Sequence, residues 1–307
     1  MGHDHGGHGG HGTAADADRR PLVAALALLV AFLLGEVVVA VLADSLALLS
    51  DAGHMLTDAA SIAAALWAMH LAGRPADPRW TFGLKRAEIL SAAGNGITLL
   101  VVSGIVLVEA IRRLVDTAPD VDAGPVLAVA VVGCLVNVAA AWLIARANRT
   151  SLNVEGAYQH ILTDLYGFVG TLVAAVVILT TGWQRADAVA ALVVVVLMLR
   201  SAWGLLRDSG RILLEGAPDD LDLEEVRRHL LELEHIVDVH DLHAWTITSG
   251  LPTLSAHLIV EDGCFSDAHT PELLDLVQDC LHDHFDVEHS TFQFERAAHA
   301  AHEHGAH

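Results

Sequence analysis

The chain has 307 residues, of which 53% are hydrophobic, and its formal net charge is −21 at pH 7. Its mean hydropathy of +0.48 is too high for an ordinary soluble domain, and its three cysteines form no CxxC pair, which argues against a disulfide framework and a thiolate zinc site. The stretch from residue 218 onward holds 20 Asp and Glu but only three Arg, and so carries −17 of the net charge. This negative field excludes nucleic acid as a partner, although the same acidity would also simply keep a domain soluble.

Residues 1–18 are rich in Gly and His, and we expect them to form a tail without fixed structure. They do not form a secretory signal peptide, because the apolar run that follows is long enough to span a membrane. The tail histidines could capture metal transiently, but a solvated tail with weak metal affinity is an equally good interpretation.

Six apolar segments approach the roughly 20 residues that a membrane-spanning helix needs. Their connections are short, so neighbouring helices should be antiparallel. The sequence therefore predicts a bundle of six transmembrane helices over residues 19–211, embedded in a lipid bilayer. The six segments are 21–43, 45–71, 89–114, 124–147, 154–181 and 186–206.

Basic residues gather at one set of helix ends, which predicts the orientation of the bundle. With the N-terminus in the cytoplasm, ten basic residues fall on the inner side and three on the outer side. We therefore expect a multi-pass protein of the cell membrane with both termini cytoplasmic. The inner residues are Arg19, Arg20, Arg74, Arg79, Lys85, Arg86, Arg146, Arg149, Arg207 and Arg211, and the outer ones are Arg112, Arg113 and Arg185.

The second and fifth segments carry nearly the same pentapeptide, in which His54 precedes Asp58 and His160 precedes Asp164 by four residues. Residues four apart lie on one face of a helix, so each copy presents one imidazole and one carboxylate together. Two such helices facing each other would supply the two nitrogens and two oxygens of a tetrahedral zinc site. A helix-stabilising His–Asp hydrogen bond is the alternative for either copy, and the repetition argues against it. Ionisable side chains inside a bilayer are costly and usually functional.

Proton coupling follows from the choice of ligands. Metal binding requires a neutral imidazole, so a divalent metal ion and a proton compete for His54 and His160. The sequence therefore predicts a zinc transporter that exchanges cytoplasmic zinc for protons, and not an enzyme. A metalloenzyme would need an open coordination position, which a cage with four protein ligands lacks. A metal sensor without flux, and a transporter of cobalt, cadmium, manganese or iron, remain as alternatives.

Other polar residues inside the apolar segments are expected to have packing or hydration roles, including hydrogen bonds between helices. They are Glu36, Asn95, Glu109 and Asn137.

After residue 211 the pattern changes to that of a small soluble domain, residues 212–296. An amphipathic helix at 221–233 is followed by strands at 237–248 and 253–260, a second helix at 271–285 and a third strand at 287–294. This order predicts an α+β domain with its helices on one face of a sheet. Residues 297–307 are a second His-rich tail for which we expect no fixed structure.

Seven histidines fall within 50 residues of this domain. His240 and His257 lie on successive predicted strands, and Glu295 ends the third, so one sheet could bring them together as a second metal site. Surface histidines in an acidic, His-rich chain are the plain alternative. The full set is His240, His243, His257, His269, His282, His284 and His289.

Four motifs carry a resemblance to a known family: SLALLSDAGHMLTD at residues 45–58, TFG with RAE at 81–88, VHDLHAW at 239–245 and HSTFQFE at 289–295. They resemble the cation diffusion facilitator family, in particular its zinc transporters, over about residues 19–295.

The resemblance implies a homodimer of six-helix protomers, each with a ferredoxin-like cytoplasmic domain. It also implies alternating access, with metal exchanged for protons at His54, Asp58, His160 and Asp164. Zinc would then be the transported substrate.

His240, His257 and Glu295 match positions that bind metal in the family's cytoplasmic domain, where a structural or regulatory ion would brace the dimer. Lys85 is a departure, because several family zinc transporters carry His there. A protonated lysine is a poor ligand, so we do not expect a metal site in that loop.

Overall fold

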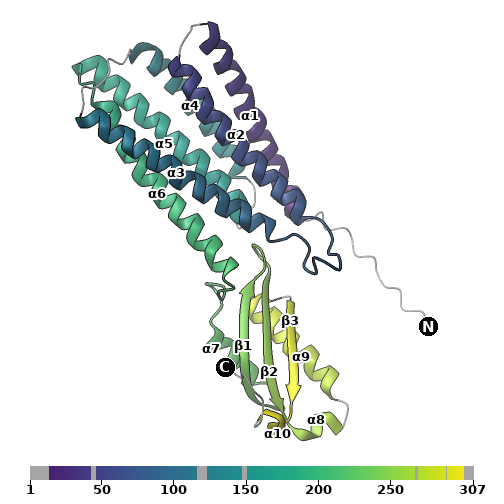
Figure 1. Cartoon of the computed structure of the whole chain (residues 1–307). Coiled ribbons are helices and arrows are strands. Elements are labelled where there is room, and N and C mark those ends of the chain that lie inside the picture. Colours follow the sequence, from purple (N-terminus) through teal and green to yellow (C-terminus); the bar gives the residue numbers. More distant parts are fainter. Residues whose placement is uncertain are drawn as a thin grey trace. The chain divides into compact units, whose positions relative to one another are not determined.

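The computed structural model describes residues 14–42, 46–115, 123–146, 151–266, 269–287 and 289–300. The chain divides into two compact units, Met1–Ser209 and Gly210–His307, which are described separately (Figure 1).

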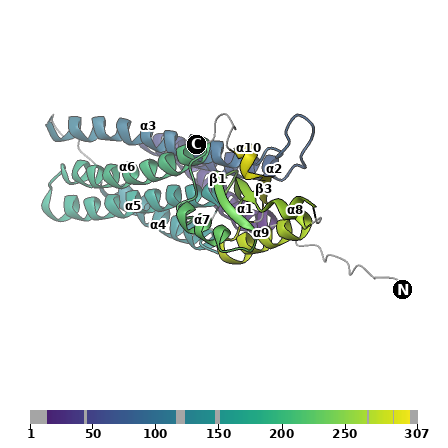
Figure 2. The same ribbon diagram turned by 90° about the horizontal axis from the view of Figure 1, so that it is seen from below.

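The first unit is helical. Helices α3 to α6 run alongside one another in two perpendicular views (Figures 1 and 2). The helices are α1 (Ala14–Leu42), α2 (Leu46–Ala72), α3 (Ala87–Val115), α4 (Ala123–Ile144), α5 (Leu152–Thr181) and α6 (Ala186–Leu213).

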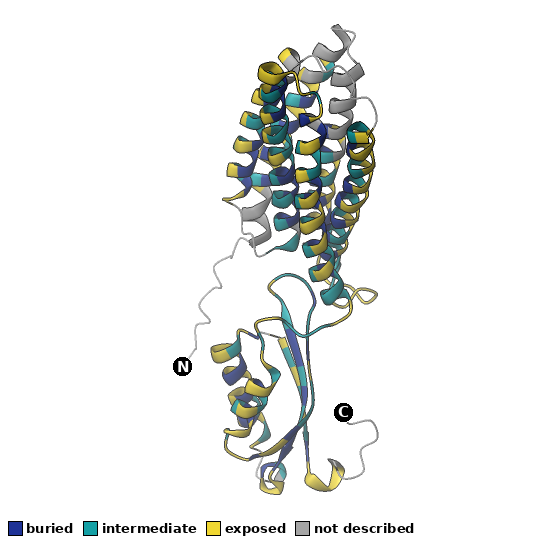
Figure 3. Ribbon diagram, turned by 90° about the vertical axis from the view of Figure 1, so that its left-hand side faces the viewer, coloured by how far each residue is buried: buried dark blue, intermediate teal, exposed yellow. Residues whose placement is uncertain are grey.

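Four of these helices contain stretches that are long and apolar enough to cross a membrane: Ala87–Val115, Leu127–Ile144, Val154–Thr181 and Ala188–Leu213. The described parts of the other two helices contribute shorter apolar stretches, Arg20–Gly35 and Asp58–Ala72. Exposed residues lie along the outer faces of the helices (Figure 3), and many of them are large and apolar, as is typical of surfaces that face lipid. Examples are Ile105, Leu135, Val176 and Val196. The chain therefore has a membrane helical domain with four clear apolar spans.

Three clusters of buried side chains hold the helices together. The largest joins α1, α2, α4 and α5 through residues such as Leu29, Ile62 and Ile144. One smaller cluster packs α3 against α6, and another packs α5 against α6. Small residues allow close approach: a Cβ added at Gly133 on α4 would overlap the ring of Phe168 on α5.

Of the polar residues expected to bond between helices, only some do so in the described part of the chain. Asn95 on α3 donates from Nδ2 to the carbonyl oxygen of Gly156 on α5 at 3.0 Å. Asn137 instead donates to Gly133 on its own helix, and Glu109 pairs with Arg113 on its own helix. The side chain of Glu36 lies outside the described residues.

Local sequence explains where two of these helices begin. Helix α1 begins at Ala14, within the stretch expected to be an unstructured tail, because Ala14 to Asp18 are mostly alanine, the strongest helix former. Helix α5 begins after Ser151, whose hydroxyl accepts a hydrogen bond from the amide of Val154. It ends at Gly182, which has the left-handed φ of 70° that favours glycine.

The second unit is a three-stranded mixed sheet in the order β1-β2-β3, with helices α7 and α9 on one face (Figure 3). Strands β1 and β2 are antiparallel, and β2 and β3 are parallel. Buried apolar side chains from the helices and the sheet, including Leu230, Leu254, Val277 and Leu281, form its core. The elements are α7 (Leu223–Leu231), β1 (Ile236–Thr246), β2 (Pro252–Val260), α8 (Asp262–Ser266), α9 (Thr270–Phe285), β3 (His289–Glu295) and α10 (Ala297–Ala300).

The expected order of helix, two strands, helix and strand is present in this unit, with the short helices α8 and α10 in addition. The expectation that the chain loses fixed structure at residue 297 was wrong for residues 297–300. These residues form α10, because their three alanines favour a helical turn, closed by a 2.8 Å hydrogen bond from the amide of His299 to the carbonyl oxygen of Arg296. Residues 301–307 lie outside the described part.

Candidate metal centres

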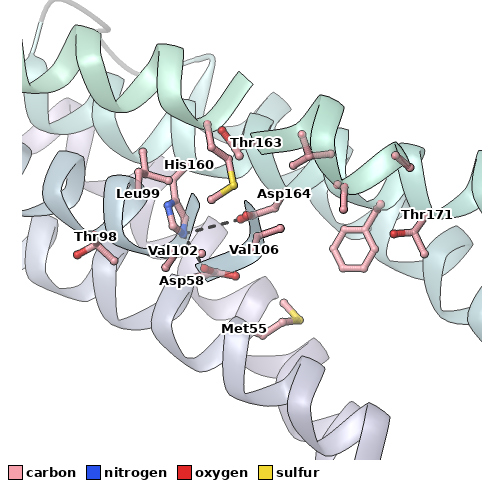
Figure 4. A pocket seen from close by; sticks show the side chains of 16 residues that line it. Met55, Asp58, Thr98, Leu99, Val102, Val106, His160, Thr163, Asp164 and Thr171 are labelled. Atoms are coloured by element: carbon pink, nitrogen blue, oxygen red, sulfur yellow. Dashed lines mark hydrogen bonds and ion pairs between the residues drawn. The ribbon is translucent and has the colours of Figure 1, made fainter. Parts of the chain in front are cut away.

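Helices α2 and α5 bring together three of the four residues of the HxxxD repeat. Asp58 on α2 and His160 and Asp164 on α5 offer ligand atoms that all lie within 4.8 Å of one another. His160 Nε2 lies 2.6 Å from Asp58 Oδ1 and 3.9 Å from Asp164 Oδ2 (Figure 4). His54 belongs to α2, but its side chain lies outside the described residues.

The apolar pattern of α5 orients these side chains. Val154, Ala157 and Ile161 are spaced three and four residues apart and are buried in the cluster shared with α1, α2 and α4. His160 therefore sits at the edge of this buried stripe and is only 6% exposed, while Asp164, one turn later, lies on the same face. The three residues meet inside the bundle because two helices with the same spacing face each other.

A cavity of about 260 Å³ adjoins the three residues and is bounded by α2, α3, α5 and α6 (Figure 4). It can hold a metal ion together with water molecules. Most of its wall is apolar. The polar residues of the lining are Asp58, Thr98, His160, Thr163, Asp164 and Thr171.

One atom, His160 Nε2, faces both carboxylates. Because a carboxylate oxygen only accepts hydrogen bonds when ionised, a 2.6 Å contact with ionised Asp58 requires a proton on Nε2. A metal ion bound at the same nitrogen would have to displace that proton. The arrangement is therefore chemically suited to hold either a proton or a divalent cation, but not both, at this nitrogen.

A second group of ligand-type residues lies on the sheet of the C-terminal unit. His240 on β1, His257 on β2 and Glu295 at the end of β3 offer ligand atoms within 4.8 Å of one another. His240 and His257 are directly paired across the antiparallel ladder, and their ring centroids are 5.3 Å apart. His257 Nδ1 lies 2.9 Å from Glu295 Oε1, and the Glu295 side chain is buried.

Sequence reasoning missed Asp241 beside this group. Its Oδ2 lies 3.8 Å from His257 Nε2, and its Oδ1 accepts a 3.0 Å hydrogen bond from His243 Nε2. The register of β1 shifts between His240 and His243, and Asp241 has a positive φ of 49°. Aspartate tolerates that conformation better than most residues, so an Asp between two histidines in a strand was the available signal for a bulge. In the described residues, His269, His282, His284 and His289 do not join the group.

Membrane-spanning helices with ionisable side chains around an internal cavity place the chain among multi-pass membrane proteins of the transporter class. The family model for the cation efflux transmembrane domain matches residues 22–214, and that for the cation efflux protein cytoplasmic domain matches residues 218–297. The chain therefore belongs to the cation efflux family, the cation diffusion facilitators, which are metal-ion transporters and not enzymes.

Known proteins are similar over nearly the whole chain. A cadmium, cobalt and zinc/H(+)-K(+) antiporter of Bacillus velezensis is 37% identical over 301 residues, covering 97% of this chain and 93% of that protein. Zinc transporter ZitB of Escherichia coli K12 is 41% identical over 297 residues, covering 96% and 93%. The solved metal-bound C-terminal domain of the CzcD transporter from Cupriavidus metallidurans is 35% identical, covers 24% of this chain and 99% of that domain, and has a TM-score of 0.23.

Proposed function

We propose that this protein is a zinc efflux transporter that exchanges cytoplasmic zinc for protons by alternating access. His54, Asp58, His160 and Asp164 would form the transport site, in which Zn²⁺ is the substrate. The names of similar proteins support zinc as the cargo and protons as the counter-ion.

The observation that carries the proposal is the meeting of Asp58, His160 and Asp164 beside a cavity between apolar helices. Charged side chains inside a bilayer cost several kcal/mol, roughly 3 kcal/mol each on insertion scales, unless they are paired or line a pathway. An imidazole and two carboxylates suit a borderline divalent cation such as zinc, and they leave room for His54 as the fourth ligand. A purely structural His–Asp bond would not need a second carboxylate or a cavity beside it.

The transport cycle follows from these residues. When the site faces the cytoplasm, Zn²⁺ displaces the protons from the imidazoles. When it faces the outside, protons at higher activity displace Zn²⁺ in turn. Alternating access requires the cavity to open to one side at a time, so ion and proton never cross together.

We extend the proposal to the whole chain. Six transmembrane helices would include α1 and α2, both termini would lie in the cytoplasm, and the protein would reside in the cell membrane as a homodimer. The domains would be a His/Gly-rich tail at 1–18, the membrane domain at 19–211, a ferredoxin-like cytoplasmic domain at 212–296 and a tail at 297–307. The basic residues at one set of helix ends and the match to the family's cytoplasmic domain support this arrangement.

His240, His257 and Glu295 would hold a structural or regulatory zinc ion in that cytoplasmic domain. The buried Glu295 carboxylate beside two imidazoles supports this, because a buried charge needs a partner or a metal ion.

A flux assay tests the transport site. The purified protein is reconstituted in liposomes with a pH gradient, and zinc flux is followed with an entrapped fluorescent indicator. Asp58→Ala and Asp164→Ala should each lower the flux by more than about 100-fold, since loss of a supporting contact alone costs 10 to 100-fold in metal affinity. Glu109→Gln is the matched control, because Glu109 is an exposed carboxylate paired with Arg113 on α3, and it should transport normally. Undiminished flux in either aspartate variant would refute the site.

A further inference from the structure

The helical layer of the C-terminal unit carries a pair of histidines that the transport site and the sheet site do not use. His229 lies in the last turn of α7, and His284 lies in the last turn of α9. Their ring centroids are 5.3 Å apart, with the ring planes inclined by 42°. The two helices pack against each other in the core of the unit through side chains such as Val226 and Val277.

Hydrogen bonds fix which nitrogen of each ring is free. His229 Nδ1 lies 3.0 Å from the carbonyl oxygen of Glu225, and His284 Nδ1 lies 3.0 Å from that of Cys280. A carbonyl oxygen can only accept, so each Nδ1 carries its proton and donates it. In the neutral form each Nε2 therefore has a free lone pair, the arrangement that metal-binding histidines use.

The spacing of the rings fits one shared metal ion. Two imidazoles bound at about 2 Å to a tetrahedral ion have ring centres about 5 Å apart. The observed 5.3 Å equals the separation of His240 and His257 on the sheet. The ring of Phe285 packs edge-on against His229, with centroids 5.1 Å apart and planes at 88°, and so restrains the orientation of that ring.

The surroundings favour a cation. Both rings lie at helix C-termini, where the aligned peptide dipoles leave partial negative charge. Acidic residues add to this negative charge. The pKa of the neighbouring Cys280 thiol is raised, first by burial and then by the charges of the Glu232 and Asp283 carboxylates. Water molecules are available for the remaining coordination positions.

This pair is separate from the group on the sheet. Leu254 and Leu258 of β2 point into the core shared with α7 and α9. Side chains alternate along a strand, so His257 lies on the opposite face of the sheet. The core therefore lies between the two sets of histidines.

We propose that His229 and His284 bind a divalent transition-metal ion, such as Zn²⁺, that clips α7 to α9 on the helical face of the C-terminal unit. Imidazole selects zinc, cobalt, nickel or copper over magnesium and calcium. This site adds to the proposed transport function and does not depend on it.

Hydrogen–deuterium exchange of the purified full chain, with and without Zn²⁺, tests the site. Some amide hydrogens exchange only when α7 and α9 separate. At a free zinc concentration ten times the dissociation constant, their exchange should become about tenfold slower, because the ion binds only the closed pair. His229→Asn and His284→Asn should each abolish the effect. Asparagine can keep the hydrogen bond that Nδ1 makes to the backbone but lacks the Nε2 ligand, so exchange without metal should match the wild type.

Two controls complete the experiment. His282→Ala removes an exposed histidine of the same helix and should leave the zinc effect intact. The pair His240→Ala and His257→Ala disables the sheet group and should also leave it intact. No protection of α7 and α9 by zinc in the wild type, or protection that persists in the double variant of His229 and His284, would overturn the proposal. Protection lost on disabling the sheet group would also overturn it, because the effect would then come from that group.

Discussion

One nitrogen atom of the proposed transport site faces both of its described carboxylates. His160 Nε2 is 2.6 Å from Asp58 and 3.9 Å from Asp164, so the atom that must hold a proton without metal is also the atom nearest to both oxygen ligands. Its other ring nitrogen, Nδ1, is buried and has no hydrogen-bond partner among the described residues. A metal ion and a proton therefore cannot occupy His160 Nε2 at the same time, which is the basis of the proposed exchange.

His54 allows a test of metal selectivity at the residue scale. His54→Asp replaces a nitrogen ligand by an oxygen ligand and so should shift preference from zinc towards manganese. We expect the ratio of zinc to manganese flux to fall by about tenfold, equivalent to about 1.4 kcal/mol of relative affinity. A competition assay in liposomes measures the ratio. His70→Asp, an exposed position on the same helix, is the control, and an unchanged ratio in His54→Asp would contradict a ligand role.

The raised pKa of His235 predicts that the stability of the C-terminal unit depends on pH. The 2.9 Å hydrogen bond between its Nδ1 and Glu261 Oε2 is the largest cause of the raised pKa of His235. Desolvation opposes this rise, and the charges of Glu261 and Glu234 add to it. Because the pKa of His235 is higher in the folded state, protonated His235 stabilises the fold. This stabilisation is complete at pH values below the unfolded-state pKa of about 6.5, and it is lost as the pH rises through the folded-state pKa.

The expected outcome is that His235→Ala speeds hydrogen exchange at the amide of Glu261 at pH 6 but not at pH 9, after correction for the intrinsic rate. That amide donates to the carbonyl oxygen of His235, so it reports on this contact directly. His282→Ala should have no effect at either pH. An equal effect of His235→Ala at both values would mean that the ion pair contributes nothing.

The meeting of Asp58, His160 and Asp164 could be predicted because the spacing of the two HxxxD pairs is periodic. An HxxxD pair on a helix fixes the direction of two side chains, and a second copy predicts that the two helices face each other. Asp241 could not be predicted in the same way. Its position depends on a bulge that shifts the register of β1, and strand periodicity alone places it on the wrong face.

At the scale of elements, α4 packs closely against α5, the helix that carries His160. Gly133 on α4 faces the ring of Phe168, and a Cβ there would overlap that ring. Gly133→Ala should therefore destabilise the membrane unit by about 1–3 kcal/mol, the usual cost of overpacking. The measurement is a melting temperature in detergent.

The control for this substitution is Gly104→Ala on α3, where an added Cβ meets nothing within 4 Å. It should be neutral or slightly stabilising, because alanine favours a helix over glycine by about 1 kcal/mol. Combining Gly133→Ala with Phe168→Ala should recover part of the loss that comes from the clash. If Gly133→Ala were as stable as the control, the close packing of α4 and α5 would be in doubt.

Helices and strands were largely predictable where the spacing of apolar residues keeps one period along the whole element. The amphipathic helix near residue 223 and the alternating strands near residues 236 and 252 lie within a few residues of their expected bounds. The short helices α8 and α10 were missed, because five and four residues are too few for a helical period to appear. Their formation depends on local turns and on neighbours in space.

At the scale of the whole molecule, composition separates two environments. Residues up to about 209 expose apolar side chains, and residues from 210 carry most of the negative charge. A membrane part and an aqueous part were therefore predictable from the sequence. The number of membrane-spanning helices is harder to predict from composition, because the described parts of α1 and α2 have shorter apolar stretches than the other four helices.

The number of spans and the orientation can be tested together with reporter fusions in a bacterial cell. Alkaline phosphatase is active only outside the cytoplasm, and green fluorescent protein is fluorescent only inside. Six spans with both termini inside predict phosphatase activity for fusions after residues 44 and 183, and fluorescence after residues 78 and 307. A domain of only four spans, α3 to α6, would place residue 44 in the cytoplasm while leaving the other three fusions unchanged. The fusion after residue 44 therefore distinguishes the two topologies, and phosphatase activity after residue 307 would reverse the orientation inferred from the basic residues.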